Sequence, residues 1–308
     1  APPLQDPLLS TRRMHPTSVT ESGLQSRAAP DDHDVANSAA TSQESPVSFL
    51  TIDDVTATYR EGKAILTALA GVSFAVAPAE FVAIIGPSGS GKSTLLDLVA
   101  GLSEPDAGAI HIHGAATTAR DRLRFAAYMH QRDLLMPWRT ALDNAAVALE
   151  AAGMPRTRAR DIARARLPEF GLDGFASTYP SQLSGGMRQR VAFLRTILAD
   201  RPLLLLDEPF GALDAFTRAG MQDFLLDLLA RERRTVLLVT HDVEEAILLA
   251  DRVVTLSPAP GRVVHIESVA LPRPRSREIV TDPQFVAHKA TILRALGLID
   301  RSTGSDGR

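Results

Sequence analysis

Apolar positions along most of the chain follow two alternating patterns. Short runs rich in Val, Ile, Leu and Phe predict strands over Phe49–Tyr59, Val72–Val76, Phe81–Ile85, Phe125–Met129, Leu203–Leu206, Val236–Val239 and Val253–Leu256. Apolar residues at helical spacing predict helices over Lys92–Ala100, Thr140–Ala152, Arg158–Phe170, Met187–Ala199, Ala215–Ala230, Val243–Leu249 and Phe285–Leu296. Because strands that alternate with helices form parallel sheets with crossover connections, the pattern predicts an α/β fold.

The first 46 residues differ in composition from the rest of the chain. They hold 6 Pro and 11 Ser or Thr, no Phe, Tyr or Trp, and six acids against three arginines. Such a segment buries too little apolar surface to offset the entropy lost on ordering, so we expect a disordered tail over 1–46. The domain that carries the chemistry is then expected over 47–270, followed by a C-terminal extension over 271–308 with one helix.

Composition removes several classes of protein. The 308 residues include no cysteine, which excludes a disulfide scaffold, Cys-ligated zinc and a Cys nucleophile. No apolar run approaches the ~20 residues that span a bilayer. A net charge of −3 gives no sign of a nucleic-acid partner. Lysine is rare, with 33 Lys and Arg together of which three are Lys, so Lys92 within a glycine-rich segment is informative.

That segment has the spacing of a phosphate-binding loop. It lies between a predicted strand and a predicted helix, and its residues are Gly86, Pro87, Ser88, Gly89, Ser90, Gly91, Lys92, Ser93 and Thr94. Its glycines let main-chain N–H groups converge on phosphate oxygens at the positive end of the helix. Lys92 would neutralise the β- and γ-phosphates, and the Ser93 hydroxyl would bind Mg²⁺. The alternative is a Ser/Gly-rich turn that contains Lys92 by chance.

Two acids end the strand Leu203–Leu206. Asp207 stands where a carboxylate can hold Mg²⁺ through water, and Glu208 where it can polarise a water in line with the γ-phosphate. Alternatively, the strand simply runs into a surface turn at Pro209.

A second helix N-terminus with anion-binding character lies at Leu183–Met187. Ser184 suits an N-cap, and Gly185 and Gly186 expose main-chain N–H groups. An ordinary helix cap is one reading. The other is a site for the same nucleotide, contributed by a partner subunit.

In this order, these motifs resemble the nucleotide-binding subunits of ABC transporters over residues 49–268. The resemblance implies a RecA-like P-loop core with an antiparallel β subdomain and a helical signature subdomain near 132–182. It assigns adenine stacking to Tyr59, the Q-loop glutamine to Gln131, the switch histidine to His241 and the D-loop to Ala212-Leu213-Asp214. Gln131 would act in catalysis and in Mg²⁺ binding, His241 would hold the γ-phosphate and the attacking water, and Asp214 would contact nucleotide. Each residue also has an ordinary structural reading, such as a strand-edge Tyr59 or a helix-capping Asp214.

One branch of the family fits the chain best. The segments Leu134–Arg139 and Glu208–Asp214 resemble the importer ATPases for nitrate, alkanesulfonate or taurine, and those for pyrimidine thiamine precursors. Trp138 is the single Trp, and it is expected either in the core or on the surface that meets the membrane subunit.

The resemblance implies ATP hydrolysis, with ATP and Mg²⁺ as cofactors, in a head-to-tail homodimer. The implied partners are multi-span membrane permease subunits and, indirectly, a periplasmic or surface solute-binding protein, with the chain peripheral at the cytoplasmic face of the membrane. A soluble ABC-type ATPase of DNA repair or translation is the main alternative, and a P-loop kinase or GTPase is another. The former would need a coiled-coil or zinc insertion or a second cassette, and the latter would lack Leu183–Met187 paired with His241.

Overall fold

The computed structural model describes residues 48–62, 64–211, 213–231 and 234–299. The predicted tail over 1–46 lies outside these residues. The central six-stranded sheet has the order β10-β9-β3-β8-β7-β6. Its strands are β3 (Phe81–Ile85), β6 (Ala126–Met129), β7 (Leu203–Asp207), β8 (Thr235–Val239), β9 (Arg252–Leu256) and β10 (Val263–Ser268). All neighbours pair in parallel except β10, which is antiparallel to β9.

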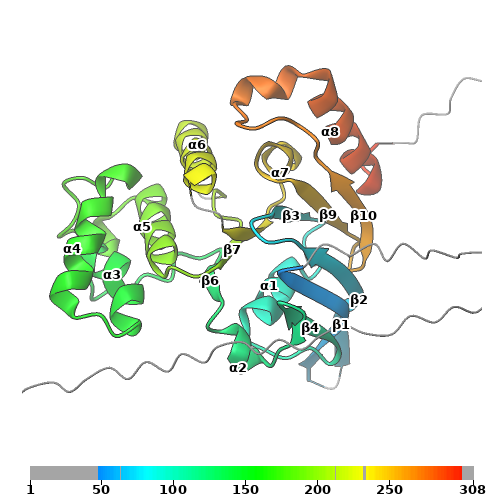
Figure 1. Cartoon of the computed structure of the whole chain (residues 1–308), viewed down its shortest axis with the longest axis horizontal. Coiled ribbons are helices and arrows are strands. Elements are labelled where there is room, and N and C mark those ends of the chain that lie inside the picture. Colours follow the sequence, from blue (N-terminus) through cyan, green and yellow to red (C-terminus); the bar gives the residue numbers. More distant parts are fainter. Residues whose placement is uncertain (1–47, 63, 212, 232–233, 300–308) are drawn as a thin grey trace, which may run out of the picture. The chain divides into compact units, whose positions relative to one another are not determined.

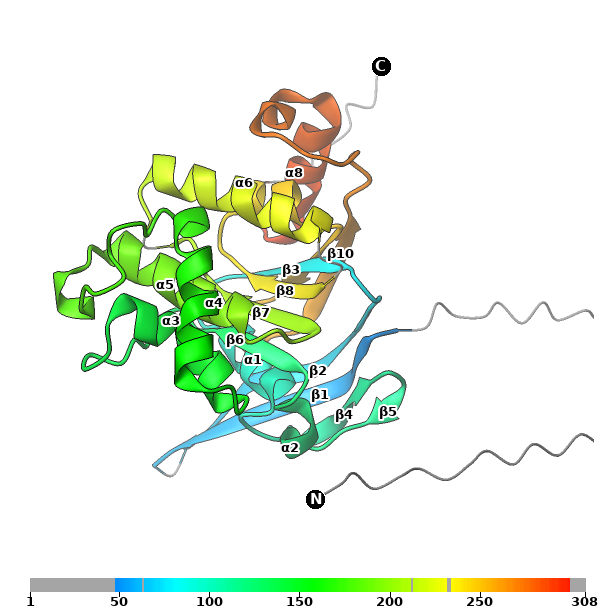
Figure 2. The ribbon, with the colours of Figure 1, turned by 60° about the vertical axis from the view of Figure 1, so that its left-hand side comes forward.

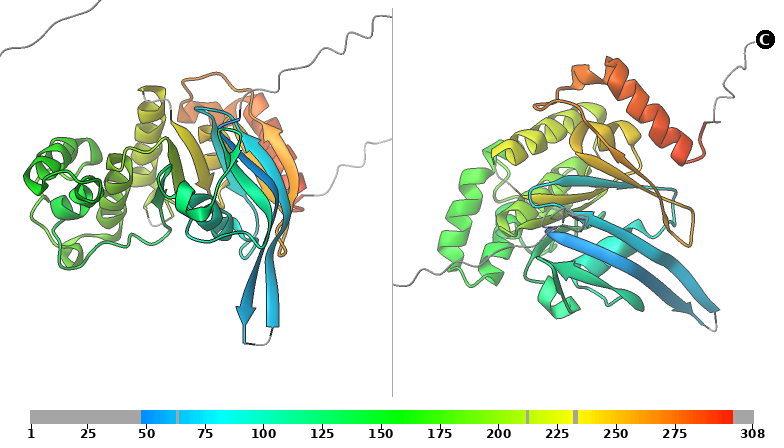
Figure 3. Two further views of the ribbon diagram at one scale, coloured as in Figure 1. Left: turned by 60° about the horizontal axis from the view of Figure 1, so that its bottom comes forward. Right: turned by 45° about the vertical axis from the view of Figure 1, so that its right-hand side comes forward.

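A second, four-stranded antiparallel sheet has the order β2-β1-β4-β5. It consists of β1 (Leu50–Glu61), β2 (Ala64–Val76), β4 (Ala107–Ile112) and β5 (Ala115–Ala116). Figure 3 shows the β1–β2 hairpin extending past the other strands of this sheet.

Helix α1 (Lys92–Ala100) packs in the core between the two sheets (Figure 2). Leu95, Leu96 and Val99 of this helix are fully buried, as their spacing predicts. Along β3, alternate residues such as Val82 and Ile84 face this core, because successive side chains of a strand point to opposite faces. The helix that opens with the phosphate-binding segment is therefore fixed rigidly against the central sheet.

The other face of the central sheet supports a larger apolar core. Its helices are α3 (Ala141–Ala151), α4 (Arg156–Arg166), α5 (Gly185–Leu198), α6 (Ala215–Arg231), α7 (Val243–Leu249) and α8 (Pro283–Ala295). In Figure 1, α3, α4 and α5 form a group at one side, and α7 and α8 lie over the β9–β10 end. Short helical turns complete the fold: α2 (Ala119–Arg122), η1 (Pro168–Phe170), η2 (Pro180–Gln182) and η3 (Arg277–Thr281).

Several element boundaries differ from the prediction. Strand β2 starts at Ala64, well before Val72, because its outer end is exposed and pairs with β1 alone, which leaves no apolar alternation to detect. The helix expected over Arg158–Phe170 ends as an α-helix at Arg166 and continues as the 3-10 turn η1, since Pro168 has no N–H to donate. Strands β4 and β10 had no predicted counterpart. The limits of the domain and of the helical subdomain stay predictions.

Candidate functional site

The phosphate-binding segment joins β3 to α1, as its spacing predicts. Gly89 and Gly91 have φ angles of 78° and 84°, in the left-handed region that glycine enters without strain. A Cβ on Gly91 would lie 2.8 Å from the main-chain oxygen of Ala68, so the chain passes too close to β2 for any larger residue. The loop therefore curls over the N-terminus of α1, whose free N–H groups and dipole favour an anion there.

Lys92 lies under this loop and is mostly buried. Its Nζ donates hydrogen bonds to the carbonyl oxygens of Gly86 at 2.8 Å and Pro87 at 2.9 Å. Burial lowers the pKa of Lys92, and the carboxylates of Glu208 and Asp207 oppose that shift. The ammonium group is thus held where the loop's phosphate ligand would lie.

Asp207 ends β7 and is buried beside α1. It accepts a hydrogen bond from the Ser93 hydroxyl, and burial raises the pKa of Asp207 against that hydrogen bond. Tyr128 of β6 contacts the same carboxylate and that of Asp97, and burial raises the pKa of the Tyr128 phenol. Tyr128 was not among the predicted residues, since a tyrosine in a short strand carries no local sign of a tertiary contact.

Glu208 follows Asp207 with φ at 46°, a conformation that is strained for a residue of this size. Its N–H donates to the Val239 carbonyl at 2.9 Å, which keeps the turn attached to β8. Its Oε2 accepts a hydrogen bond from Gln131 Nε2 at 3.0 Å and lies 3.6 Å from His241 Nδ1. The structure therefore brings together the three residues predicted for catalysis.

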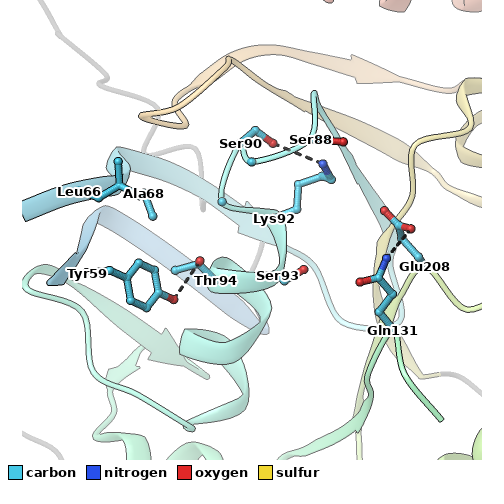
Figure 4. A pocket seen from close by; sticks show the side chains of 12 residues that line it. Tyr59, Leu66, Ala68, Ser88, Ser90, Lys92, Ser93, Thr94, Gln131 and Glu208 are labelled. Carbon is cyan, nitrogen blue, oxygen red and sulfur yellow. Dashed lines mark hydrogen bonds between the residues drawn. The ribbon is translucent and has the colours of Figure 1, made fainter. Parts of the chain in front are cut away.

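A cavity of about 400 Å³ connects Gln131 and Glu208 with Tyr59 (Figure 4). Its lining residues are Tyr59, Leu66, Ala68, Ser88, Gly89, Ser90, Gly91, Lys92, Ser93, Thr94, Gln131 and Glu208. The Tyr59 hydroxyl donates to Thr94 Oγ1 at 3.0 Å, which fixes the ring at the apolar end of the cavity. Leu66 and Ala68 of β2 were not predicted, because the sequence pattern did not show β2 reaching this far.

The segment Leu183–Met187 and Asp214 lie outside that cavity's described lining. Ser184 is exposed and caps α5 by accepting a hydrogen bond from Met187 N at 3.2 Å, as predicted. Asp214 Oδ1 accepts from Phe216 N and Thr217 N at the start of α6, and these hydrogen bonds, the one from Thr217 foremost, lower the pKa of Asp214. Within one chain, both residues thus act as helix caps, and their predicted contacts with nucleotide would require a second copy.

Trp138 resolves one open alternative. Its side chain is 73% exposed, so the core reading is wrong and the surface reading remains. Leu134, on the same connecting segment, is also half exposed. Two exposed apolar side chains on the segment that follows Gln131 are consistent with contact to another subunit.

The fold and this cavity define a P-loop nucleotide-binding protein with a glutamate, Glu208, beside the phosphate loop. Residues 69–211 match the family model described as ABC transporter. The taurine import ATP-binding protein TauB of Chromobacterium violaceum is 42% identical over 249 residues, covering 79% of this chain and 94% of that protein. An ABC transporter ATP-binding protein of Methanocaldococcus jannaschii, MJ0412, is 43% identical over 229 residues, covering 74% of this chain and 84% of the relative.

The chain belongs to the ABC transporter ATP-binding family, and it is an ABC-type ATPase subunit. A solved dimeric structure of the ATP-binding cassette MJ0796 in a post-hydrolysis state, bound to ADP and Pi, matches 72% of this chain and 100% of its own. The TM-score is 0.67 and the sequence identity 33%, which confirms the predicted fold class. Among the residues that the structure describes, no helix combines the length and apolar character required to cross a bilayer.

Proposed function

We propose that the chain powers solute import by hydrolysing ATP in the cavity between Tyr59 and Glu208. The observation that supports this most directly is the convergence of Lys92, Glu208 and Gln131 around one cavity at the N-terminus of α1. Tyr59 would stack on adenine through its ring face, and the loop N–H groups with Lys92 would hold the phosphates. Glu208 would take the proton of the attacking water, with His241 beside it to hold the γ-phosphate.

The donor set near α1 fits Mg²⁺. Ser93 offers a hydroxyl, Gln131 an amide oxygen and Asp207 a carboxylate, all hard oxygen ligands of the kind that Mg²⁺ accepts together with substrate phosphates. In Figure 4 the Gln131 amide oxygen points away from Glu208, on the side where Ser93 lies. When bound, Mg²⁺ would neutralise charge on the β- and γ-phosphates.

A head-to-tail dimer accounts for the residues outside the cavity. The exposed Ser184 with Gly185 and Gly186 at the N-terminus of α5 would meet the γ-phosphate of the partner's ATP, with Asp214 near that contact. The related MJ0796 cassette forms dimers. Permease subunits would contact the exposed Leu134 and Trp138, and the chain would then lie at the cytoplasmic face of the membrane.

Relatives named as taurine import proteins favour import over the DNA-repair or translation alternative. They also favour a sulfonate such as taurine as the solute, supplied by a solute-binding protein. Deleting the gene in its own organism should abolish uptake of labelled taurine and leave nitrate and pyrimidine uptake intact. Loss of nitrate or pyrimidine uptake alone would overturn this choice of solute.

The ATPase role is tested by Lys92→Ala in the purified full chain. Because two phosphates lose their neutralising charge, ATP binding should weaken and Mg²⁺-dependent hydrolysis should fall to background. Lys289→Ala is the matched control, since Lys289 pairs with Glu244 on the surface. Near-normal hydrolysis by Lys92→Ala would contradict the phosphate-loop assignment.

A further inference from the structure

Hydrogen bonds among three side chains connect the C-terminal segment with the residues around Glu208. Arg277 of η3 donates from Nη2 to Gln222 Oε1 at 2.6 Å, and Gln222 Nε2 donates to Glu245 Oε2 at 3.1 Å. Gln222 lies on α6 and Glu245 on α7, and both are buried. Because a guanidinium can only donate, Arg277 fixes which end of the Gln222 amide faces Glu245.

Glu245 reaches a second, much smaller pocket on its other side. This pocket, of about 20 Å³, includes Glu208, Arg218, Thr240, His241, Asp242 and Glu245 in its lining. Glu208 therefore lines both this pocket and the ATP cavity. His241, which is also predicted to act in hydrolysis, lines this pocket as well.

Two buried polar atoms of this lining are unsatisfied. Neither Glu245 Oε1 nor Arg218 Nε has a hydrogen-bond partner among residues 48–62, 64–211, 213–231 and 234–299. Leaving such groups unpaired is unfavourable, and a pocket of this volume has room for one water molecule. A water there would donate to Glu245 Oε1 and accept from Arg218 Nε. It would therefore connect α7 with α6 in a pocket that Glu208 also lines.

The groups around Glu245 shift the pKa of its carboxyl group. Burial raises the pKa of Glu245 to about 7, and Asp242 adds to the rise, while Thr240, Gln222 and Arg218 oppose it. Glu208 and His241 face the same pocket, and Arg277 reaches Glu245 only through Gln222. From α8, Lys289 is bound to the neighbouring Glu244.

We propose that Glu245 is a positioning residue for ATP hydrolysis, held by Arg277 through Gln222. It acts through a water shared with Arg218, which donates from Nη2 to the Leu213 carbonyl at 3.1 Å in the turn after Glu208. In this arrangement the ionised Glu245 holds the Arg218 guanidinium and the water, and the protonated form releases them. The proposal rests on the proposed role of Glu208 as the base. It assigns the C-terminal segment a part in catalysis through η3.

The decisive experiment compares kcat and KM for Mg·ATP of the full chain and of Glu245→Gln between pH 6 and pH 8. Dividing the parental kcat by the kcat of Glu245→Gln at each pH cancels titrations that both proteins share, such as that of ATP. We assume that Glu245→Gln lowers kcat tenfold when the parental Glu245 is fully ionised, and that the pKa of Glu245 is about 7. The ratio of parental to variant kcat should then rise from roughly 2 at pH 6 to about 9 at pH 8. KM should stay within about twofold, because Glu245 does not line the ATP cavity.

Glu244→Gln and Lys289→Met are the matched controls, since that surface pair joins α7 to α8 without touching the pocket. Their kcat ratios to the parent should stay near one at every pH. Arg277→Met should lower kcat by about threefold alone and cause no further loss in the Glu245→Gln background, as residues acting through one contact are not additive.

The proposal would be overturned if the ratio of parental kcat to the kcat of Glu245→Gln did not change with pH. It would also be overturned if the effects of Arg277→Met and Glu245→Gln on kcat were additive. Glu208→Gln, measured in parallel, separates it from the proposed function. If Glu208→Gln hydrolyses ATP at the parental rate, the assignment of the base fails. If Glu208→Gln is inactive while Glu245→Gln behaves like Glu244→Gln, only the role of Glu245 fails.

Discussion

Replacing Glu208 with Gln separates ATP binding from hydrolysis. The substitution keeps the length of the side chain and removes the proton acceptor together with its negative charge. The main chain at Glu208 stays held by its N–H bond to Val239, and the Gln131 amide can still donate to the new amide oxygen. We therefore expect the melting temperature to change by no more than about 1–2 °C, as for a surface-like isosteric change.

The loss of rate follows from the chemistry of the missing base. General base catalysis contributes about 10²–10⁴-fold, which corresponds to about 3–5.5 kcal/mol in the activation free energy. ATP binding should persist or strengthen, because Tyr59 and Lys92 are unchanged and one negative charge leaves the cavity wall. The mutant should therefore hold ATP without turning it over and accumulate as the closed dimer.

The assay combines single-turnover hydrolysis with size-exclusion mass in the presence and absence of Mg·ATP. Adding Ser184→Arg to Glu208→Gln provides the second arm, because a bulky side chain at the exposed N-cap of α5 should block the dimer contact. ATP binding to the phosphate loop should remain in that double variant. Hydrolysis by Glu208→Gln at the parental rate would refute the assignment of the base, and a Glu208→Gln that stays monomeric at saturating ATP would refute a dimer formed by this subunit alone.

Two further substitutions, each with a control substitution, test the phosphate-binding loop and the C-terminal segment. Gly91→Ala should destabilise the chain by about 2 kcal/mol or more and abolish ATP binding, because its Cβ would lie 2.8 Å from the main-chain oxygen of Ala68 at a φ of 84°. Gly89→Ala, which has a φ of 78° and nothing within 4 Å of its Cβ, should cost only about 1 kcal/mol in the same chemical denaturation experiment. Arg275→Met should cost about 3 kcal/mol or more, since its buried guanidinium bonds five main-chain carbonyls at 2.6–3.4 Å, whereas the exposed Arg294→Met should be neutral in thermal melts.

The parts of the site that are local in sequence could be predicted from it. The phosphate loop occupies nine consecutive residues, and its glycine spacing encodes the turn that the structure shows. The pairing of Gln131 with Glu208 joins residues 77 positions apart. Spacing alone gave no sign of that contact, and it entered the prediction through family resemblance.

Other features depend on packing that leaves no local pattern. Arg122 is one of many arginines, yet it is fully buried and bonds the carbonyls of Leu98, Thr117 and Ser103. Nothing in an arginine-rich composition distinguishes it from a solvated residue. Tyr128 contacts Asp207 only because β6 and β7 lie side by side in the sheet.

Two arginines of α5 connect the proposed dimer contact with the proposed permease surface. Arg195 donates to the carbonyls of Leu134 at 2.9 Å and Asp133 at 2.7 Å, and Arg188 Nε donates to Asp133 Oδ2 at 3.0 Å. The helix that begins at Ser184 is thereby bonded to the segment that carries Leu134. Because these hydrogen bonds are charge-assisted and Arg195 is partly buried, we expect α5 and this segment to move as one body. A closing movement of α5 toward a partner's ATP would then displace the apolar surface near Gln131 by a similar amount, which is the mechanical link that coupling of hydrolysis to import requires.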